Sequence, residues 1–275
     1  MKIHIYEDTL VDIPWVSEYK ELYAEHLQKI GVEVEMITSA ENCSGYLLLG
    51  HISELHRYRF ENTYTKCRLI MQMNGTSLLR YNRHIDRKQE QKDLEECWLN
   101  ITANDEFTRY ARKEFGLDNI FTVGFPVKDQ EPAEKEKGLF CIAGKLDPSK
   151  LVTLSIKIAM DNPDFKRLVI CYPKASRELV KYYPKHEKIS YLECDHDALI
   201  DMLKKSEYFV VSSLEDTTNL THVEAIKCGC KTICKDHGEI LPYYQTNLQN
   251  IEKFSADYCA KTLMNLIKFY EDEDL

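Results

Sequence analysis

Short apolar segments alternate with helical patterns along nearly the whole chain, and this alternation constrains the fold more than any other feature. Most apolar segments end in glycine or a polar residue, as residues 46–49 do at Gly50 and residues 68–73 do at Asn74. Such alternation predicts an α/β fold with a mainly parallel sheet and helices on both of its faces. Ligands of such sheets collect at the carboxyl ends of the strands. The other expected strands are residues 2–6, 32–36, 99–103, 120–123, 139–143, 167–172, 189–192, 208–212 and 231–235.

Helical periodicity fills the intervals between these strands. Residues 19–30 repeat apolar side chains at helical spacing, with Ser17 suited to cap the helix and Gly31 suited to end it. The apolar and acidic residues that alternate over residues 32–36 predict a half-exposed edge strand. Further helices are expected at residues 104–115, 151–160, 176–182, 198–204, 221–228 and 255–270.

One charged segment divides the chain into two α/β halves. Residues 128–137, KDQEPAEKEK, contain a proline and no apolar period, which is typical of a linker. We therefore expect an N-terminal domain at residues 1–130, a C-terminal domain at 138–250, and a C-terminal helix with an acidic tail at 251–275. Two such halves predict a cleft that binds a small molecule, held mostly by one half while the other supplies a second substrate.

Composition argues against several classes of protein. The mean hydropathy is −0.43 and no long apolar run occurs, so no membrane-spanning helix is expected. The N-terminus, MKIHIYEDTL, lacks the apolar stretch of a secretory signal, which favours a cytoplasmic protein. The ten cysteines are scattered, several of them in apolar strand-like runs, so buried reduced thiols are expected. Without a C-x-x-C or G-x-G-x-x-G motif, we expect no metal and no nicotinamide or flavin cofactor.

Charge is unevenly distributed along the chain. The net charge is −9, yet residues 56–92 contain nine basic and three acidic residues, a net charge of +6. Tyr58, Phe60, Tyr64 and Tyr81 are interleaved with these charges. A basic patch with aromatic residues is typical of an anionic partner such as nucleic acid, a phosphorylated glycan or a membrane surface. A solvated helical face is the alternative, and it is the commoner origin of a charge run.

Residues 212–238 hold the best candidate for a binding site. Asp216 and Glu224 stand eight positions apart, with polar residues between them ahead of an expected helix start. A helix N-terminus carries free N–H groups and a partial positive charge and can hold a phosphate, while a carboxylate on the helix can face the sugar of the same ligand. The segment from Thr221 to Glu224 is also a T-x-x-E capping box, which requires no ligand.

A second polar loop follows the first expected strand of the C-terminal half. Gly144 opens this loop, and Lys145 and Lys150 stand five positions apart in it before a helix. Such a pair can neutralise a diphosphate leaving group, which departs as an anion. Two surface lysines near a turn are the alternative reading. The predicted topology places this loop and the Asp216 loop on neighbouring strand ends.

In combination, these motifs resemble those of glycosyltransferase family 4. The run Gly144-Lys-Leu-x-x-x-Lys150 is similar to the family's G-R-L-x-x-x-K-G. Asp216, seven spacers and Glu224-Ala-Ile-x-x-Gly229 are similar to its E-G-F-G-x-x-x-x-E-A-x-A-x-G-x-P. The resemblance is strong over residues 139–238 and weak before residue 99. It implies the GT-B fold, in which two Rossmann-like domains face across a cleft, and retaining transfer from a nucleotide sugar without a metal.

The resemblance also implies a role for each matching residue. Lys145 and Lys150 would bind the donor diphosphate, and Asp216, the third residue implied in catalysis, would contact hydroxyl groups of the sugar. Glu224 would bond the nucleotide ribose, while backbone N–H groups near Leu220 would cap the phosphate. Positioning and charge stabilisation would then outweigh proton transfer. The residues implied in donor binding are Gly144, Thr218, Asn219, Leu220 and Glu224.

The sequence departs from the family pattern in three places. Lys145 replaces an arginine, which keeps the charge and loses the planar fork. Thr217 and Asn219 replace both loop glycines, and threonine tolerates left-handed backbone poorly. The loop is therefore expected to take a different path or to hold an unusual donor sugar. Asp216 is one methylene shorter than the family's glutamate and reaches the sugar differently.

The N-terminal half is expected to hold the acceptor. His51 is the nearest candidate for a histidine of the family's N-domain, Asn74 lies near its place, and Arg80 and Arg83 belong to the basic segment. The resemblance implies an envelope glycan or a glycolipid as acceptor. The basic segment also fits glycosylation of a modified base in DNA, which would require base extrusion, or peripheral docking on a membrane.

Three functions stay open from the sequence alone. They are an active retaining glycosyltransferase, a GT-B nucleotide-sugar epimerase that needs no separate acceptor, and a nucleotide-sugar-binding protein without turnover. The acidic pair and both lysines favour the first function. The basic segment argues against the second, and the missing loop glycines favour the third.

Overall fold

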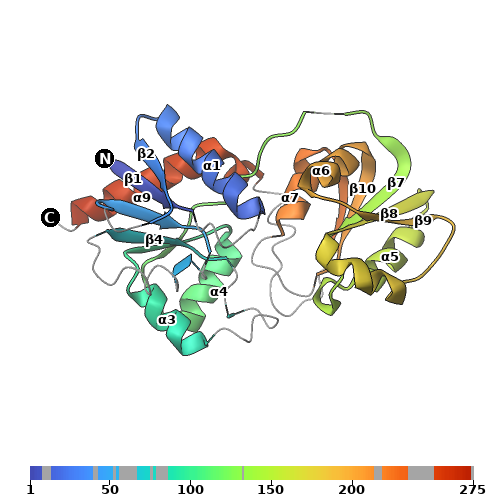
Figure 1. Ribbon diagram of the computed structural model, residues 1–275, viewed down its shortest axis with the longest axis horizontal. Coiled ribbons are helices and arrows are strands. Elements are labelled where there is room, and N and C mark those ends of the chain that lie inside the picture. Colours follow the sequence, from blue (N-terminus) through green and yellow to red (C-terminus); the bar gives the residue numbers. More distant parts are fainter. Residues whose placement is uncertain are drawn as a thin grey trace. The chain divides into compact units, whose positions relative to one another are not determined.

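The chain forms two compact units in the computed structural model. Unit 1 contains residues 1–128 and 250–275, and unit 2 contains residues 129–249. Each unit is built on one parallel sheet with helices on its two faces (Figure 1). The C-terminal helix, expected as a separate element, belongs to unit 1. The structure describes residues 1–7, 14–39, 43–51, 54–55, 67–74, 77–78, 86–131, 133–213, 219–234 and 251–273.

Unit 1 holds a six-stranded sheet in the order β2-β1-β3-β4-β5-β6, and every neighbouring pair is parallel. Helices cover both faces of the sheet, so its inner strands are continuous apolar runs, and all four residues of β3 are buried. β2 lies at an edge and has no fully buried residue, as its alternating pattern predicts. The strands are β1 (Lys2–Tyr6), β2 (Glu33–Ile37), β3 (Tyr46–Leu49), β4 (Arg68–Gln72), β5 (Leu99–Thr102) and β6 (Ile120–Thr122).

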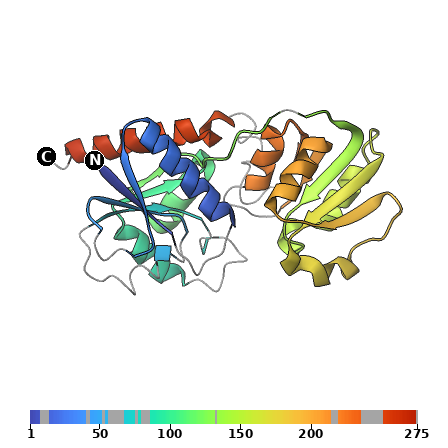
Figure 2. The same ribbon diagram turned by 45° about the horizontal axis from the view of Figure 1, so that its top comes forward.

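The helices of unit 1 lie on opposite faces of its sheet (Figures 1 and 2). On one face, α1 (Pro14–Lys29) packs against α9 (Ala256–Glu273), which follows the short 3₁₀ helix η4 (Ile251–Phe254). The other face carries α3 (Arg87–Glu95) and α4 (Asp105–Phe115).

The two predicted helix starts in unit 1 differ in outcome. The prediction that Ser17 caps α1 is wrong, because the helix already begins at Pro14 and Ser17 lies inside it. Proline suits the first helical position, since its φ is fixed near the helical value and its missing N–H would have no partner there. In α4 the structure follows the prediction, and the Asn104 side chain accepts a hydrogen bond from the Phe107 N–H at 2.8 Å.

Unit 2 holds a five-stranded parallel sheet in the order β11-β10-β7-β8-β9. Its apolar core lies between this sheet and α5. The helices α6 and α7 lie on the other face (Figure 1). The strands are β7 (Glu136–Ala143), β8 (Arg167–Tyr172), β9 (Ile189–Glu193), β10 (Ser206–Val211) and β11 (Lys231–Cys234). The helices are η2 (Pro148–Lys150), α5 (Val152–Met160), η3 (Lys174–Tyr182), α6 (His196–Lys205) and α7 (Leu220–Lys227).

Two predicted elements of unit 2 require correction. β7 begins at Glu136, inside the expected linker, where the Glu136 carboxylate pairs with Arg167 of the neighbouring strand. The α-helix expected at residues 176–182 is a 3₁₀ helix, η3. Only Ser176 of η3 is buried, so little packing supports a regular α-helix there.

Six of the ten cysteines are buried, in agreement with the expectation that several lie in apolar strands. Across the residues that the structure describes, no helix has the length and apolar character needed to cross a membrane.

Candidate functional site

The loop after β7 presents a lysine at the carboxyl edge of the unit 2 sheet. Gly144 has a φ of 128°, a value that favours glycine, and it turns the chain directly after the strand. Lys145 is exposed, whereas Leu146 is buried and its N–H donates to the Ser176 hydroxyl at 3.1 Å. Packing of Leu146 therefore anchors the loop while the Lys145 side chain stays accessible.

Lys150 lies farther along the same loop and ends η2. Asp147 caps this 3₁₀ helix by accepting a hydrogen bond from the Ser149 N–H at 2.9 Å. Leu151 follows with a φ of 46°, and it is the one non-glycine residue of positive φ in the described ranges. Sparsely populated backbone of this kind persists only where the surroundings hold it. α5 begins directly after Leu151.

The carboxyl end of β10 lies beside that of β7, because the two strands are hydrogen-bonded neighbours. The Ser212 hydroxyl donates to the Leu151 carbonyl oxygen at 3.1 Å. Since that hydroxyl has one proton, the Ser155 hydroxyl donates to Ser212 Oγ across 2.5 Å. These bonds tie the end of β10 to the loop of the two predicted diphosphate-binding lysines. The predicted adjacency of the two strand ends is confirmed.

α7 starts at Leu220, with Asn219 as its cap. Asn219 Oδ1 accepts a hydrogen bond from the His222 N–H at 3.0 Å. The capping box expected from Thr221 to Glu224 is therefore wrong. Thr221 lies inside the first turn, because Asn219, two residues earlier, already satisfies a free N–H group at the helix start.

Glu224 bonds a histidine from another helix instead of the start of its own. Its Oε1 lies 2.8 Å from Nε2 of His196, the first residue of α6. Glu224 is only 7% exposed, and α6 and α7 pack against each other. The sequence gives no sign of this pair, because 28 positions separate the residues and no local period relates them.

Several predicted site residues lie outside the described residues. They are Asp216, Thr218, Arg80 and Arg83. Within the described ranges, Asn219 is buried at the start of α7 and Leu220 is half-buried. The parts of the predicted donor site that the structure brings to one edge of the sheet are thus Gly144, Lys145, Lys150, Asn219, Leu220 and Glu224.

Buried polar groups fill the carboxyl edge of the unit 1 sheet. Asn74 follows β4 and donates to the Gly50 carbonyl oxygen at 3.1 Å, while the Gly50 N–H donates to Glu54 Oε2 at 2.6 Å. Lys20 of α1 donates to Glu54 Oε1 and to the Tyr6 carbonyl oxygen. Lys20 and Glu54 are each 1% exposed, so this ion pair is fully enclosed.

This network positions His51, which directly follows Gly50 and is half-buried. The Glu54 N–H donates to the His51 carbonyl oxygen at 2.9 Å and closes a turn. A Cβ atom at position 50 would lie 1.8 Å from the Tyr19 hydroxyl, so only glycine fits there. The two predicted acceptor-side residues, His51 and Asn74, therefore both adjoin Gly50. The sequence did not reveal Lys20 or Glu54.

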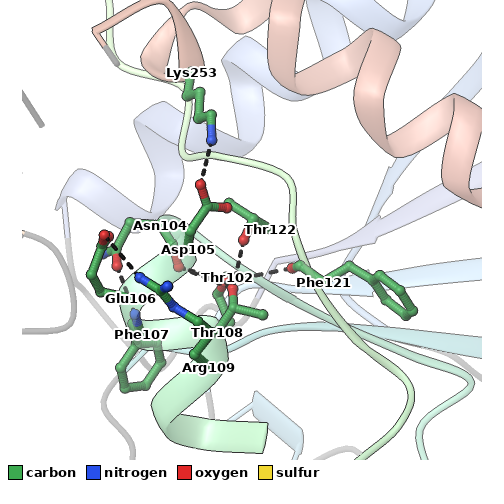
Figure 3. Close-up of polar contacts among 10 residues, drawn as sticks. All are labelled: Thr102, Asn104, Asp105, Glu106, Phe107, Thr108, Arg109, Phe121, Thr122 and Lys253. Atoms are coloured by element: carbon green, nitrogen blue, oxygen red, sulfur yellow. Dashed lines mark hydrogen bonds and ion pairs between the residues drawn. The ribbon is translucent and has the colours of Figure 1, made fainter. Parts of the chain in front are cut away.

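A second polar network joins β5 and β6 to the start of α4 (Figure 3). The Thr108 hydroxyl lies 2.7 Å from the Thr122 hydroxyl and also contacts that of Thr102. Lys253 of η4 reaches down to Asp105 and donates to its Oδ2 at 2.7 Å. Burial alone would raise the pKa of Asp105, but hydrogen bonds from Lys253 and Thr122 hold that pKa below its ordinary value. The network fastens the returning C-terminal segment to the sheet.

No protein-family model matches the sequence, and no curated protein matches it. Solved structures do match nearly the whole chain. One is an alpha-glucosyltransferase in complex with UDP-glucose and DNA containing an abasic site, with 13% identity and a TM-score of 0.61. The match covers 98% of this chain and 95% of that one. The chain has the GT-B fold.

Two further structures share the fold. TarM of S. aureus, in complex with UDP, has 13% identity and a TM-score of 0.56. The match covers 83% of this chain and 53% of TarM, so the chain spans about half the length of TarM. A presumed UDP-N-acetylglucosamine 2-epimerase from Listeria monocytogenes has 13% identity and a TM-score of 0.57, covering 99% of this chain and 97% of that one. The fold expected from the sequence is confirmed, while the narrower resemblance to glycosyltransferase family 4 stays a prediction.

Proposed function

We propose that the protein is a glycosyltransferase that moves a sugar from a nucleotide-sugar donor to an acceptor. The observation that supports this most is that β7 and β10 end side by side at one edge of the unit 2 sheet. The accessible Lys145 lies in the loop after β7, and the buried Glu224 lies on the helix that follows β10. TarM and the alpha-glucosyltransferase are in complexes with UDP and UDP-glucose, which favours a uridine diphosphate sugar as donor.

In this proposal, charge stabilisation at the leaving group drives the transfer. The acceptor hydroxyl oxygen bonds to the anomeric carbon as the bond between that carbon and the diphosphate breaks, and the hydroxyl proton passes to the departing diphosphate. Lys145 and Lys150 neutralise the negative charge that remains on the diphosphate. The free N–H groups at the start of α7 add a partial positive charge at the same edge. Asp216 orients the sugar through its hydroxyl groups, and Glu224 binds the ribose. The two lysines supply the charge that a metal supplies in other transferases, so the proposed transfer needs no metal. Retention of the anomeric configuration is a separate part of the proposal and comes from the resemblance to glycosyltransferase family 4.

The acceptor binds to unit 1 in this proposal. His51 and Asn74 lie at the carboxyl edge of its sheet, where the buried Lys20–Glu54 pair fixes the turn that carries His51. An envelope glycan or a glycolipid is the proposed acceptor.

A screen of nucleotide sugars tests the proposal. Incubation with uridine, guanosine and adenosine diphosphate sugars should release one nucleoside diphosphate slowly by hydrolysis, and faster with the acceptor. Lys145→Ala should slow this release about 100-fold, while Lys188→Ala, which removes another exposed lysine of unit 2, should leave it unchanged. Isomerised sugar without release would identify an epimerase, and tight binding without turnover would identify a binding protein. Either result would contradict the proposal.

A second acceptor, a modified base in DNA, is favoured by the basic segment at residues 56–92. One structure of the same fold is a complex with DNA. A gel shift of duplex DNA at low salt should appear with the unchanged protein and vanish in the Arg80→Glu, Arg83→Glu double variant if DNA is the acceptor. No binding at low salt would eliminate this acceptor and leave the glycan.

A further inference from the structure

Glu224 and His196 form a largely buried polar pair where α6 and α7 meet. Glu224 Oε1 lies 2.8 Å from His196 Nε2, and the Glu224 side chain is 10% exposed. An ionised carboxylate only accepts hydrogen bonds, so the proton of this bond belongs to His196 Nε2. A buried carboxylate requires such donors to offset its lost hydration. His196 therefore fixes the orientation of the Glu224 carboxylate.

The backbone around His196 is itself anchored. His196 is the first residue of α6, and Asp195 caps that helix by accepting a hydrogen bond from the Ala198 N–H at 2.9 Å. β9, which ends at Glu193, is held by Arg177 through two hydrogen bonds of 2.5 and 2.7 Å. The backbone that carries the imidazole thus starts from a capped helix end at the carboxyl edge of the sheet. The His196 side chain is 30% exposed, so part of the ring borders the solvent from which a ligand arrives.

We propose that His196 is a positioning residue for recognition of the donor ribose. The inference rests on the proposed function, in which Glu224 accepts hydrogen bonds from the ribose hydroxyl groups. With Oε1 held by His196, Oε2 is the oxygen that accepts from those hydroxyls. A carboxylate held in one orientation loses less conformational freedom on binding than a rotating one, so the pair increases affinity for ribose.

Removal of the imidazole should weaken ribose recognition and leave the other contacts of the nucleotide unchanged. His196→Ala is expected to raise the Kd for UDP about tenfold, because the released carboxylate must be ordered when the ribose binds. The Kd for 2′,3′-dideoxy-UDP, which lacks both hydroxyl groups, should stay at its value for the unchanged protein. Isothermal titration calorimetry measures both constants.

Two further variants separate a donor effect from a packing effect. His196→Gln keeps an N–H donor within reach of Glu224 and should recover most of the affinity for UDP. His196→Phe fills similar space without a donor and should bind UDP as weakly as His196→Ala. If His196→Ala does not fold, this pair carries the test, and equal UDP affinities of the two variants would overturn the inference.

The outcomes distinguish this inference from the proposed function. If the unchanged protein binds no UDP, the proposed uridine donor and this inference fail together. If it binds UDP and the dideoxy analogue equally, or if His196→Ala weakens both ligands by the same factor, the positioning role is overturned while the proposed function stands. A selective loss of UDP affinity that His196→Gln restores would establish the role.

Discussion

The carboxyl edges of the two sheets differ in how they treat charge. In unit 1, Lys20 and Glu54 are each 1% exposed and bond to each other and to the backbone of Tyr6 and Gly50. In unit 2, Lys145 occupies the loop after the central strand and is exposed. The first edge satisfies these charges within the protein, whereas the second leaves the Lys145 charge exposed to solvent.

This difference separates residues that stabilise the fold from residues that act on a ligand. A buried ion pair loses hydration on both sides, and its two members depend on each other. Removal of an exposed lysine should change the free energy of unfolding very little. Any large effect of its removal would therefore come from a ligand that it binds. Substitutions at the two edges should therefore fall into two classes, one that changes stability and one that changes transfer.

The largest effect is expected from Lys20→Met. This variant leaves the Glu54 carboxylate buried without its cation, which should lower the free energy of unfolding by about 3–5 kcal/mol. Both tryptophans, Trp15 and Trp98, belong to unit 1, so urea unfolding followed by tryptophan fluorescence reports on this unit.

Two controls sharpen this prediction. The double variant Lys20→Met, Glu54→Gln removes both charges and should regain part of the loss. Arg167→Ala breaks an exposed pair with Glu136 in unit 2 and should cost less than about 1 kcal/mol, measured by hydrogen exchange of β7 and β8. Equal costs for Lys20→Met and Arg167→Ala would remove the distinction between buried and exposed pairs.

The next effect is a pH dependence in unit 2. Burial lowers the pKa of His222 from 6.5 to about 4. His222 of the unfolded chain therefore binds a proton below about pH 6.5, whereas His222 of the folded chain binds it only below about pH 4. Stability of unit 2 should fall as the pH drops through this window, by up to about 3 kcal/mol, and should show no His222 contribution above it.

Hydrogen exchange of the β10 amides, corrected for the intrinsic pH dependence of exchange, measures this slope. His222→Asn cannot titrate and should flatten it between pH 6.5 and 4. An unchanged slope in that variant would assign the pH dependence to other groups.

The strands could be predicted from the sequence because sheets covered on both faces leave continuous apolar runs. β1, β3 and β8 begin and end as predicted, and the other strands differ by a few residues at most. The errors arose where a local signal competed with another one. Ser17 is a suitable cap residue, but α1 already begins at Pro14. Thr221 is also a suitable cap residue, but Asn219 caps α7 two residues earlier.

Only those parts of the candidate site that belong to local sequence motifs could be predicted. The ends of the two strands were predicted to be neighbours from the topology of the fold that the motifs resemble. The α/β rhythm alone does not fix this order, because β7 and β10 are not consecutive in the chain. His196 and Glu54 were missed because each bonds a partner at least 28 positions away, Glu224 and Lys20 respectively, and such contacts depend on tertiary packing. Local periodicity carries no information about them.

A third prediction tests the exposed charge of unit 2. Lys145→Ala should lower kcat/KM for sugar transfer by about 100-fold, because it removes a positive charge from the departing diphosphate. Hydrogen exchange of β7 and β10 should stay at its original level, since the side chain is exposed and Leu146 keeps the loop in place. Lys145→Arg should retain most of the activity. A loss of exchange protection in Lys145→Ala would show that Lys145 stabilises the fold, as Lys20 is expected to do, and would contradict the distinction between the two residues.

The smallest effect concerns Lys253, whose pair with Asp105 is partly buried and therefore intermediate between the two edges. Lys253→Ala should reduce the protection of the Val127 N–H against hydrogen exchange by about 1 kcal/mol, because this N–H donates to the Phe254 carbonyl oxygen at 3.0 Å.

Lys261→Ala is the matched control, because Lys261 also lies 2.7 Å from a carboxylate but the pair with Asp257 is exposed within α9. Lys261→Ala should cost only a few tenths of a kcal/mol. Equal protection of Val127 in the two variants would mean that the pair does not fasten the returning segment. A larger loss of protection in Lys253→Ala would instead show that the partly buried pair contributes more to stability than the exposed pair.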